Sequence, residues 1–392
     1  MDYEATRGGG GGGITMNVVA TLMECLSAIA VESGKSEGGG DNKWFEDATR
    51  NMLENLVDLS AFAGIPVTLQ LLRSIVSSAP QSAKEAQSAE WRDTSVCAAI
   101  LREAEAKSRD AGPEVFADFE ECQRYWLRDF PALSEKTRSI IVLSFAMLVR
   151  PFITRPLAGL FSRPLTNITP EDCCAGKIIV VDLPIQEYHL AGRLANLAWK
   201  YCFQRAVMRR QPPTEPGTYL RPVVLWADEA QGFITKFDAE YQAVARSAGG
   251  CTVYLTQNRE SYRRVLGDDD AVDSLLGNLQ AKFFCQNSST GTNGWASSLF
   301  GERWVELMTR TGGATGAGVG NTDGRVTANA GFSTVHQRRH YIEAAEFAML
   351  RRGGERNAFL VDCYVYNGGE RYLSLDGKEE VPFKFLTFDQ RS

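Results

Sequence analysis

The stretch VVLWADEAQGF, residues 223–233, carries the strongest structural signal in the chain. A short apolar run at residues 223–227 is followed at once by Asp228 and Glu229. Runs of this kind are typical of strands buried in a parallel sheet. In nucleotide hydrolases, an Asp at such a strand end holds Mg²⁺ through water, and an adjacent Glu polarises the attacking water. The pattern favours that kind of site, although an acidic pair can also simply cap a following helix.

The next apolar run, in CTVYLTQN at residues 251–258, also ends in polar residues. Open parallel sheets bind ligands at the carboxyl ends of their strands, so Gln257 would lie beside the γ-phosphate and orient the reacting groups there. The alternative is an ordinary polar loop residue.

Arg246 stands in ARSAGG, between these two runs. An Arg at this place could reach a nucleotide in its own or in a neighbouring subunit. An Arg late in a helix is also a common surface residue or partner of the helix dipole, and the sequence leaves both interpretations open.

The order of the elements predicts an α/β fold with a parallel sheet flanked by helices. GKIIVVDLP, residues 176–184, is expected to form another buried strand, followed by a helix over roughly residues 192–210. The alternation continues to a strand in AKFFCQN, residues 281–287. Residues 14–150 show helical periodicity and no clear strand, which predicts an all-helical block. Residues 311–331, rich in Gly, Ala and Thr, are expected to form a mobile loop.

A phosphate-binding loop of the pattern Gly-x-x-x-x-Gly-Lys-Ser/Thr is missing from this sequence. The only Gly-Lys-Ser is Gly34-Lys35-Ser36, where Ile29 occupies the place of the first Gly and a helix, not a strand, precedes. Without the backbone amides and the Lys of such a loop, most contacts to a triphosphate are lost. We therefore expect this chain alone to bind ATP weakly or not at all. The abrupt start and the hexaglycine Gly8–Gly13 suggest a coding region that begins further upstream.

Composition excludes several classes of protein. With a net charge of -6 over 392 residues, a basic surface that coats nucleic acid is not expected, although a local basic channel remains open. Nine Cys without a CxxC pair, and three His away from them, predict a reducing compartment and no zinc site. The longest apolar run, residues 140–149, is too short to span a bilayer, and no signal peptide begins the chain. We expect a cytoplasmic, soluble segment that would reach a membrane only through partners or a missing segment.

Several motifs in order resemble the type IV secretion coupling proteins of the TraG/TraD group. The resemblance covers roughly residues 160–310 and extends more weakly to the first residues and to EFAMLRRGGERNAFLVDCYVY, residues 346–366. Its motifs are GKIIVVDLPIQEYHLAGRLANLAWKYCFQRAVMRR, RPVVLWADEAQGF, VARSAGGCTVYLTQN and LLGNLQAKFFCQN.

This resemblance implies a RecA-like motor domain with an all-helical domain inserted into it. Residues 1–40 would then be a helix and Gly-rich loops that lead into the core, and residues 41–155 the inserted domain. Residues 156–392 would form the motor core with the Gly-rich loop and the C-terminal strands. Asp228 and Glu229 match the Walker B pair, and Gln257 matches the polar residue of the next strand.

Members of this group are hexameric ATPases anchored in the bacterial inner membrane. The resemblance implies ATP and Mg²⁺ as cofactors, with Asp228 holding Mg²⁺ through water. It implies as partners a TraM-like relaxosome protein, single-stranded DNA, components of the secretion channel and further copies of the chain in a homo-hexamer. The membrane would be reached through a missing N-terminal segment at the cytoplasmic face.

The sequence departs from the family pattern in two places. The upstream membrane helices and the Walker A segment are absent. Gly249 stands where the family often has a second basic residue, which weakens an arginine relay through Arg246.

Three interpretations follow from these residues: a motor ATPase that lacks its N-terminal part, a non-catalytic adaptor that keeps the partner-binding surface, and a DEAD-like helicase. The retained Asp228 and Glu229 favour the first. The helicase interpretation is supported only by the sequence Asp-Glu-Ala-Gln at residues 228–231.

Overall fold

The computed structural model describes residues 3–4, 13–32, 39–162, 165–215, 217–314, 328–374 and 377–391. Internal contacts divide the chain into two compact units, which are described separately. The first unit comprises Met1–Thr256 with Arg263–Ala271, and the second comprises Gln257–Tyr262 with Val272–Ser392. Among the described residues, no helix combines the length and the apolar character that a membrane span requires.

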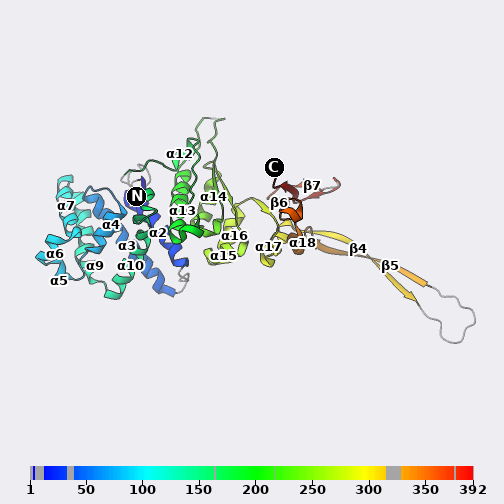
Figure 1. The fold of residues 1–392 in the computed structure, drawn as a ribbon, viewed down its shortest axis with the longest axis horizontal. Helices are drawn as coiled ribbons and strands as arrows, with labels where there is room; N and C mark the ends of the chain where they lie inside the picture. The colour runs from blue at the N-terminus through cyan, green and yellow to red at the C-terminus, as the bar shows by residue number, and fades with distance from the viewer. Residues whose placement is uncertain are drawn as a thin grey trace, which may run out of the picture. The chain divides into compact units, whose positions relative to one another are not determined.

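The N-terminal part of the first unit is helical (Figure 1). No strand occurs among the described residues between 13 and 153, as the periodicity predicted. Ser and Thr side chains begin many of these helices by accepting a hydrogen bond from the third helical amide; Thr68 and Ser134 are two of them. The helices are α2 (Gly13–Glu32), α3 (Gly39–Phe62), α4 (Leu69–Ser77), α5 (Ala83–Ala86), α6 (Ala89–Thr94), α7 (Val96–Ala111), α8 (Pro113–Arg124), α9 (Phe130–Ala132) and α10 (Glu135–Ile153), with a π-helical turn at Tyr125–Asp129.

The helical block and the start of α13 (Ile185–Met208) share one hydrophobic core. Leu22 of α2, Trp126 and Leu194 of α13 are all at most 1% exposed and belong to this core. The Trp126 indole also donates a hydrogen bond of 3.2 Å to the carbonyl of Asn55. Because the packing is continuous from α2 to α13, the helical block is joined to the sheet region of the same unit.

The sheet region of the first unit contains two parallel strands. β1 (Val223–Ala227) pairs with β2 (Gly250–Tyr254), with Val223 opposite Gly250 and Ala227 opposite Tyr254. α13 and α14 (Phe237–Ala245) supply Phe203, Val207 and Tyr241 to the core beside β1. The parallel α/β arrangement predicted around VVLWADEAQGF is confirmed.

The prediction of a strand at residues 176–184 is wrong. The short helices α11 (Ala158–Phe161) and α12 (Glu171–Cys174) come before this segment, which then runs without strand pairing to α13. Ile178 is 92% exposed and Val180 is 81% exposed. An apolar β-branched run becomes a strand only where a neighbouring strand accepts its backbone hydrogen bonds. No strand among the described residues does so here.

The second unit is built on an antiparallel sheet. β3 (Ala281–Phe284) pairs with β6 (Leu360–Asn367), which pairs with β9 (Lys384–Asp389). Phe284, Phe300 and Phe347 form an aromatic core under this sheet. They come from β3, α17 (Thr290–Phe300) and α18 (Ala344–Met349). The prediction of β3 as a further parallel strand is therefore wrong, because its partner lies far along the chain and local alternation does not reveal it.

A long hairpin also belongs to the second unit. β4 (Glu302–Ala314) pairs with β5 (Ala328–His340) over their whole length. The loop predicted at 311–331 is therefore strand at both ends, since β-pairing continues through small residues. Its middle, residues 315–327, lies outside the described residues.

The remaining helices and strands are α15 (Arg259–Leu266), α16 (Asp269–Asn278), β7 (Tyr372–Leu373) and β8 (Glu380–Val381).

Candidate functional site

Asp228 and Glu229 follow β1 directly, at its carboxyl end. Asp228 is exposed, and its Oδ1 accepts a hydrogen bond of 2.9 Å from the Glu229 amide. Glu229 is half-buried, and its Oε2 accepts a hydrogen bond from the Gln231 side-chain amide. The two carboxylates thus lie together at one edge of the sheet, Asp228 open to solvent and Glu229 held in place.

Glu229 has a left-handed backbone, with φ 49° and ψ 44°. A non-glycine residue in this conformation costs about 1–2 kcal/mol. The surrounding backbone enforces it: Leu255 donates to the Ala227 carbonyl at 2.9 Å, and Ala230 donates to the Leu255 carbonyl at 2.9 Å. A strained backbone conformation persists only where the surrounding contacts hold it, and strained residues are often found at functional sites.

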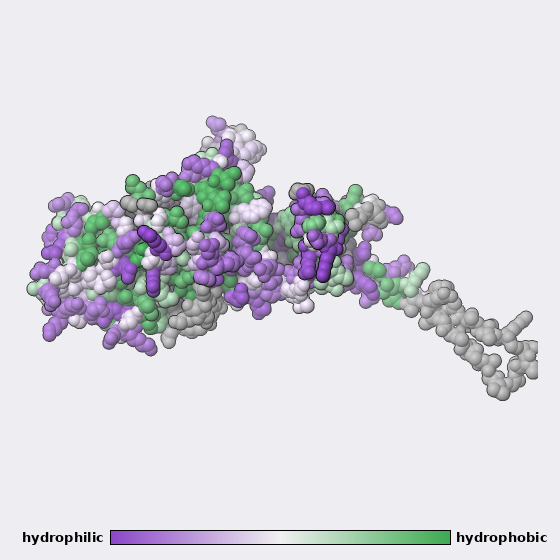
Figure 2. Space-filling model, in the orientation of Figure 1, coloured by the Kyte–Doolittle hydropathy of each residue, from purple (hydrophilic) through white to green (hydrophobic). Residues whose placement is uncertain are grey.

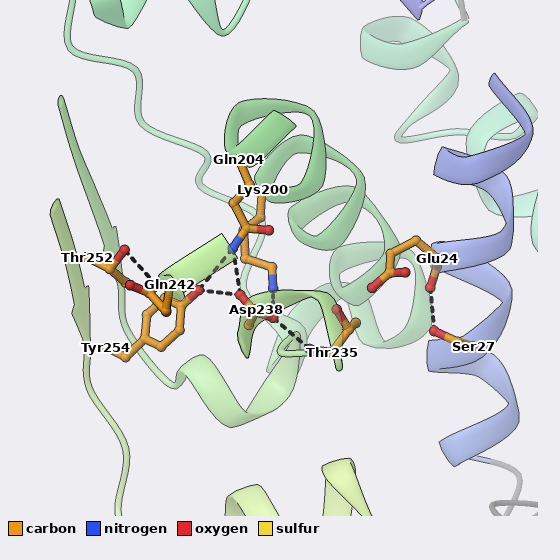
Figure 3. Close-up of polar contacts among 9 residues, drawn as sticks. All are labelled: Glu24, Ser27, Lys200, Gln204, Thr235, Asp238, Gln242, Thr252 and Tyr254. Carbon is orange, nitrogen blue, oxygen red and sulfur yellow. Dashed lines mark hydrogen bonds and ion pairs between the residues drawn. The ribbon is translucent and has the colours of Figure 1, made fainter. Parts of the chain in front are cut away.

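A buried ion pair supports the loop that follows Glu229 (Figure 3). Asp238 of α14 is 0% exposed and Lys200 of α13 is 3% exposed, and they contact each other directly. The Asp238 carboxylate also accepts hydrogen bonds from Gln204 at 2.7 Å, from the Thr235 amide at 2.7 Å and from the Tyr254 hydroxyl. One carboxylate thereby connects α13, α14, β2 and the loop between Glu229 and α14.

Helix α2 contributes Glu24 to the same region, where its side chain extends toward Thr235 (Figure 3). Burial raises the pKa of Glu24 above its ordinary value, against a smaller opposing effect of its hydrogen bond with the Thr235 side chain and of the Lys200 charge. One Glu24 carboxyl oxygen, Oε1, is buried without a hydrogen-bond partner among the described residues. Burial at this place therefore makes the protonated form of Glu24 more favourable than it is for an exposed Glu.

The acidic pair borders a groove of about 1210 Å³ in the first unit. The unpaired segment 177–184 forms one wall, and β1 with residues of α13 forms the other. Val224 and Trp226 of β1 are 56% and 67% exposed. Figure 2 shows an apolar area, green, over the part of this unit where Figure 1 labels α13 and α14.

Arg246 lies at the other end of the parallel pair. It caps the C-terminus of α14, just before β2 begins at Gly250, and is exposed. Because β1 and β2 run parallel over five residues, Arg246 and Asp228 are separated by the length of the strands, roughly 16 Å. Arg246 forms no ion pair with any described residue. The structure does not bring it together with the acidic pair of its own chain.

Gly249 is the position at which the sequence departs from the family pattern of a second basic residue. Its φ is +70°. A Cβ there would lie 3.1 Å from the Leu220 Cβ, so a larger side chain would be strained in this turn. An arginine relay through this position does not fit the local backbone.

Gln257 comes soon after β2 and is exposed. By its contacts it belongs to the second unit, where its carbonyl accepts a hydrogen bond of 2.6 Å from the Asn287 side-chain amide. Gln257 thus follows β2 along the chain, and its role beside a γ-phosphate stays a prediction.

The described residues contain no group of three or more His, Cys, Asp or Glu side chains that could hold a metal ion. Mg²⁺ in nucleotide sites is held by one or two carboxylates together with water and substrate phosphates. The exposed Asp228 carboxylate beside Glu229 fits that partial ligand set. The pair could hold Mg²⁺ only as part of a complex with a phosphate ligand.

Sequence reasoning missed the network around Asp238. Lys200 had a detectable signal, because it lies on the apolar face of α13 near Leu197 and Phe203. A Lys at such a position requires a buried counter-charge. Asp238 itself resembles an ordinary acidic residue in the first turn of a helix.

Comparison with known protein families gives a match over the region that contains the acidic pair. Residues 222–352 match the family model described as the TraM recognition site of TraD and TraG. This region includes β1, the acidic pair, β2 and the β4–β5 hairpin. No curated protein sequence matches the chain.

Solved structures of the coupling protein TrwB have a similar fold. The unbound monoclinic form of the bacterial conjugative coupling protein TrwBdeltaN70 is 16% identical, with a TM-score of 0.51 over 95% of this chain and 70% of that chain. Its trigonal form with sulphate gives 16% identity and a TM-score of 0.54 over 94% of this chain and 67% of that chain. The plasmid coupling protein TrwB in complex with ADP and Mg²⁺ gives 15% identity and a TM-score of 0.51 over 95% of this chain and 69% of that chain. The RecA-like α/β fold and the resemblance to TraG/TraD-type coupling proteins are both confirmed.

Proposed function

We propose that this chain is part of a conjugative coupling ATPase, which uses ATP hydrolysis to deliver relaxosome-bound single-stranded DNA or protein into a type IV secretion channel. The observation that carries the proposal is the acidic pair at the carboxyl end of β1, with Glu229 held in a left-handed conformation. The family match over residues 222–352 and the TrwB-like fold support it.

Each acidic residue has a separate role in this proposal. Asp228, exposed at the strand end, holds Mg²⁺ through a water molecule when Mg-ATP is bound. Glu229 orients and polarises the attacking water, and the Gln231 amide fixes its carboxylate. TrwB structures contain ADP with Mg²⁺ and nucleotide analogues, which supports ATP and Mg²⁺ as the cofactors.

The other two predicted site residues are assigned to a complete assembly. For Gln257 the proposal keeps the role beside the γ-phosphate that the sequence predicts. Arg246 acts on the nucleotide of a neighbouring subunit, because the strand length separates it from the acidic pair of its own chain. This role requires an oligomer, for which we propose a homo-hexamer.

The partners follow from the same proposal. They are a TraM-like relaxosome protein, single-stranded DNA and components of the secretion channel. Residues 41–155 form the inserted helical domain and residues 156–392 the motor core. The assembly works at the cytoplasmic face of the bacterial inner membrane, where a segment upstream of these residues provides the anchor.

Glu229→Gln in a chain that includes the upstream phosphate-binding segment tests this proposal. Loss of a general base lowers turnover by roughly 10²–10⁴-fold. ATP turnover should therefore collapse, while nucleotide binding measured by calorimetry survives. The matched control is Glu240→Gln, which changes an exposed Glu of α14 and should leave turnover unchanged. Unchanged turnover in Glu229→Gln would remove Glu229 from this role.

A second candidate is a non-catalytic module that recognises a TraM-like relaxosome protein. The family model over residues 222–352 favours it, because that model describes a recognition site and not a catalytic one. Such a module would bind its partner in a pull-down equally well with Asp228 and Glu229 both changed to Ala. A DEAD-like helicase, the third interpretation, has no further observation in its favour.

A further inference from the structure

Two cysteines of the second unit stand opposite each other on neighbouring strands. β3 and β6 are antiparallel, with Phe283 opposite Val365 and Phe284 opposite Tyr364. Continuing this register by one residue places Cys285 opposite Cys363. Opposite residues of an antiparallel pair project from the same face of the sheet, so these two thiols are neighbours on one face.

The strand geometry suits a covalent bond between them. Opposite residues in an antiparallel pair have Cα atoms roughly 4.5–5.5 Å apart. A disulfide bridges Cα atoms roughly 4.4–6.8 Å apart. The Cα separation expected for this pair therefore lies within the range that a disulfide bridges.

The two thiols differ in exposure and in acidity. Cys285 is exposed and Cys363 is 0% exposed. The hydrogen bond from Cys363 lowers the pKa of Cys285 to about 7. The hydrogen bond to Cys285, with burial, raises the pKa of Cys363. The lowered pKa gives Cys285 more thiolate at neutral pH than an ordinary exposed thiol has.

We propose that Cys285 and Cys363 are an oxidisable dithiol, which a peroxide converts into a cross-strand disulfide. The exposed Cys285 reacts first and the buried Cys363 resolves the product. This inference concerns the second unit and does not depend on the proposed ATPase function.

The reaction balances in two steps. The Cys285 thiolate attacks one peroxide oxygen, the O–O bond breaks, and Cys285 becomes a sulfenic acid while hydroxide leaves and takes up a proton. The Cys363 sulfur then attacks the Cys285 sulfur and loses its proton. The S–O bond breaks and water leaves. Two thiols and one hydrogen peroxide give one disulfide and two water molecules.

The disulfide would join the end of β3 to β6. Cys285 lies two residues before Asn287, which contacts Gln257. Cys285 precedes Gln286 and Asn287, and the Asn287 side chain donates to the Gln257 carbonyl at 2.6 Å. The cross-link would therefore fix the chain segment that holds this residue.

Peptide mapping of residues 1–392 tests the proposal. The reduced chain is treated with one equivalent of hydrogen peroxide, its remaining thiols are alkylated, and its tryptic peptides are identified by mass spectrometry. We expect two alkylatable thiols to be lost per chain and a peptide pair joined through Cys285 and Cys363. Cys251→Ser is the matched control, since Cys251 is also exposed, and this variant should retain the cross-link.

Two further variants separate the steps. Cys285→Ser, at an exposed position, should lose the cross-link, while circular dichroism confirms that it is folded. Cys363→Ala should leave Cys285 as a sulfenic acid that dimedone traps. The proposal is overturned if Cys285 and Cys363 remain fully alkylatable after peroxide, or if the cross-link joins other cysteines such as Cys173 and Cys174.

Discussion

Asp228 and Asp238 lie ten residues apart and differ completely in what surrounds them. Asp228 is exposed at the end of β1 and accepts one short-range hydrogen bond, from the Glu229 amide. Asp238 is fully buried against Lys200, Gln204, Thr235 and Tyr254. The comparison shows that a carboxylate used for support has all its acceptor positions satisfied by the protein, whereas one available to a metal ion does not.

The largest expected effect is a loss of stability in the variant Asp238→Ala. This change leaves the Lys200 ammonium buried without its partner, which costs about 3–5 kcal/mol. Urea unfolding of residues 1–392, followed by circular dichroism, measures the loss. Asp228→Ala is the matched control, and it should cost no more than about 1 kcal/mol because only an exposed turn contact is lost. Equal losses in the two variants would contradict the division of roles.

A smaller and opposite effect is expected from Glu229→Gly. Glycine adopts the left-handed conformation without the penalty that a side chain imposes, so the free energy of unfolding should rise by about 1 kcal/mol. Asp228→Gly, at a position without a positive φ, should instead lower it. A destabilised Glu229→Gly variant would show that the Glu229 side-chain contacts outweigh the strain.

The smallest effect concerns Glu24 and depends on pH. Because burial raises the pKa of this carboxyl, the folded state holds its proton more tightly than the unfolded state. Glu24 therefore contributes stability that is present below its unfolded pKa, about 4.3, and is lost as the pH rises through the folded value.

Glu24→Gln removes this titration. The variant should be more stable than the wild-type chain at pH 7, and the difference should vanish below about pH 4. Unfolding curves at several pH values measure it, with Glu120→Gln as an exposed control on α8. A difference that does not change with pH would exclude ionisation of Glu24 as its cause.

The sequence predicted the parts of the fold that depend on local pattern. β1, β2 and the helices have apolar periodicities that determine their type, and Thr68 and Ser134 begin helices through their side-chain hydrogen bonds. Residues 178–181 are apolar and β-branched, as strand residues often are, but they have no partner strand among the described residues. The partner of β3 begins only at residue 360. Pairing between distant segments is not encoded in either segment alone, so these two predictions failed.

The candidate site was predictable to a similar extent. Asp228 and Glu229 stand at a strand end, which the sequence reveals. The left-handed backbone of Glu229 was not predictable, because Glu is not a residue that favours it. The support by Asp238 was also missed, since three of its four donors, Lys200, Gln204 and Tyr254, come from other elements of the chain.

The central claim is that Asp228 belongs to the metal-binding half of a nucleotide site whose phosphate-binding half is not in this sequence. Titration calorimetry with Mg-ATP tests it directly, on residues 1–392 and on a chain extended by the upstream phosphate-binding segment that the proposed function requires. We expect weak or no binding to residues 1–392, and binding to the extended chain that loses its Mg²⁺ dependence in Asp228→Ala. Tight Mg-ATP binding to residues 1–392, or Mg²⁺ dependence that survives Asp228→Ala, would contradict the claim.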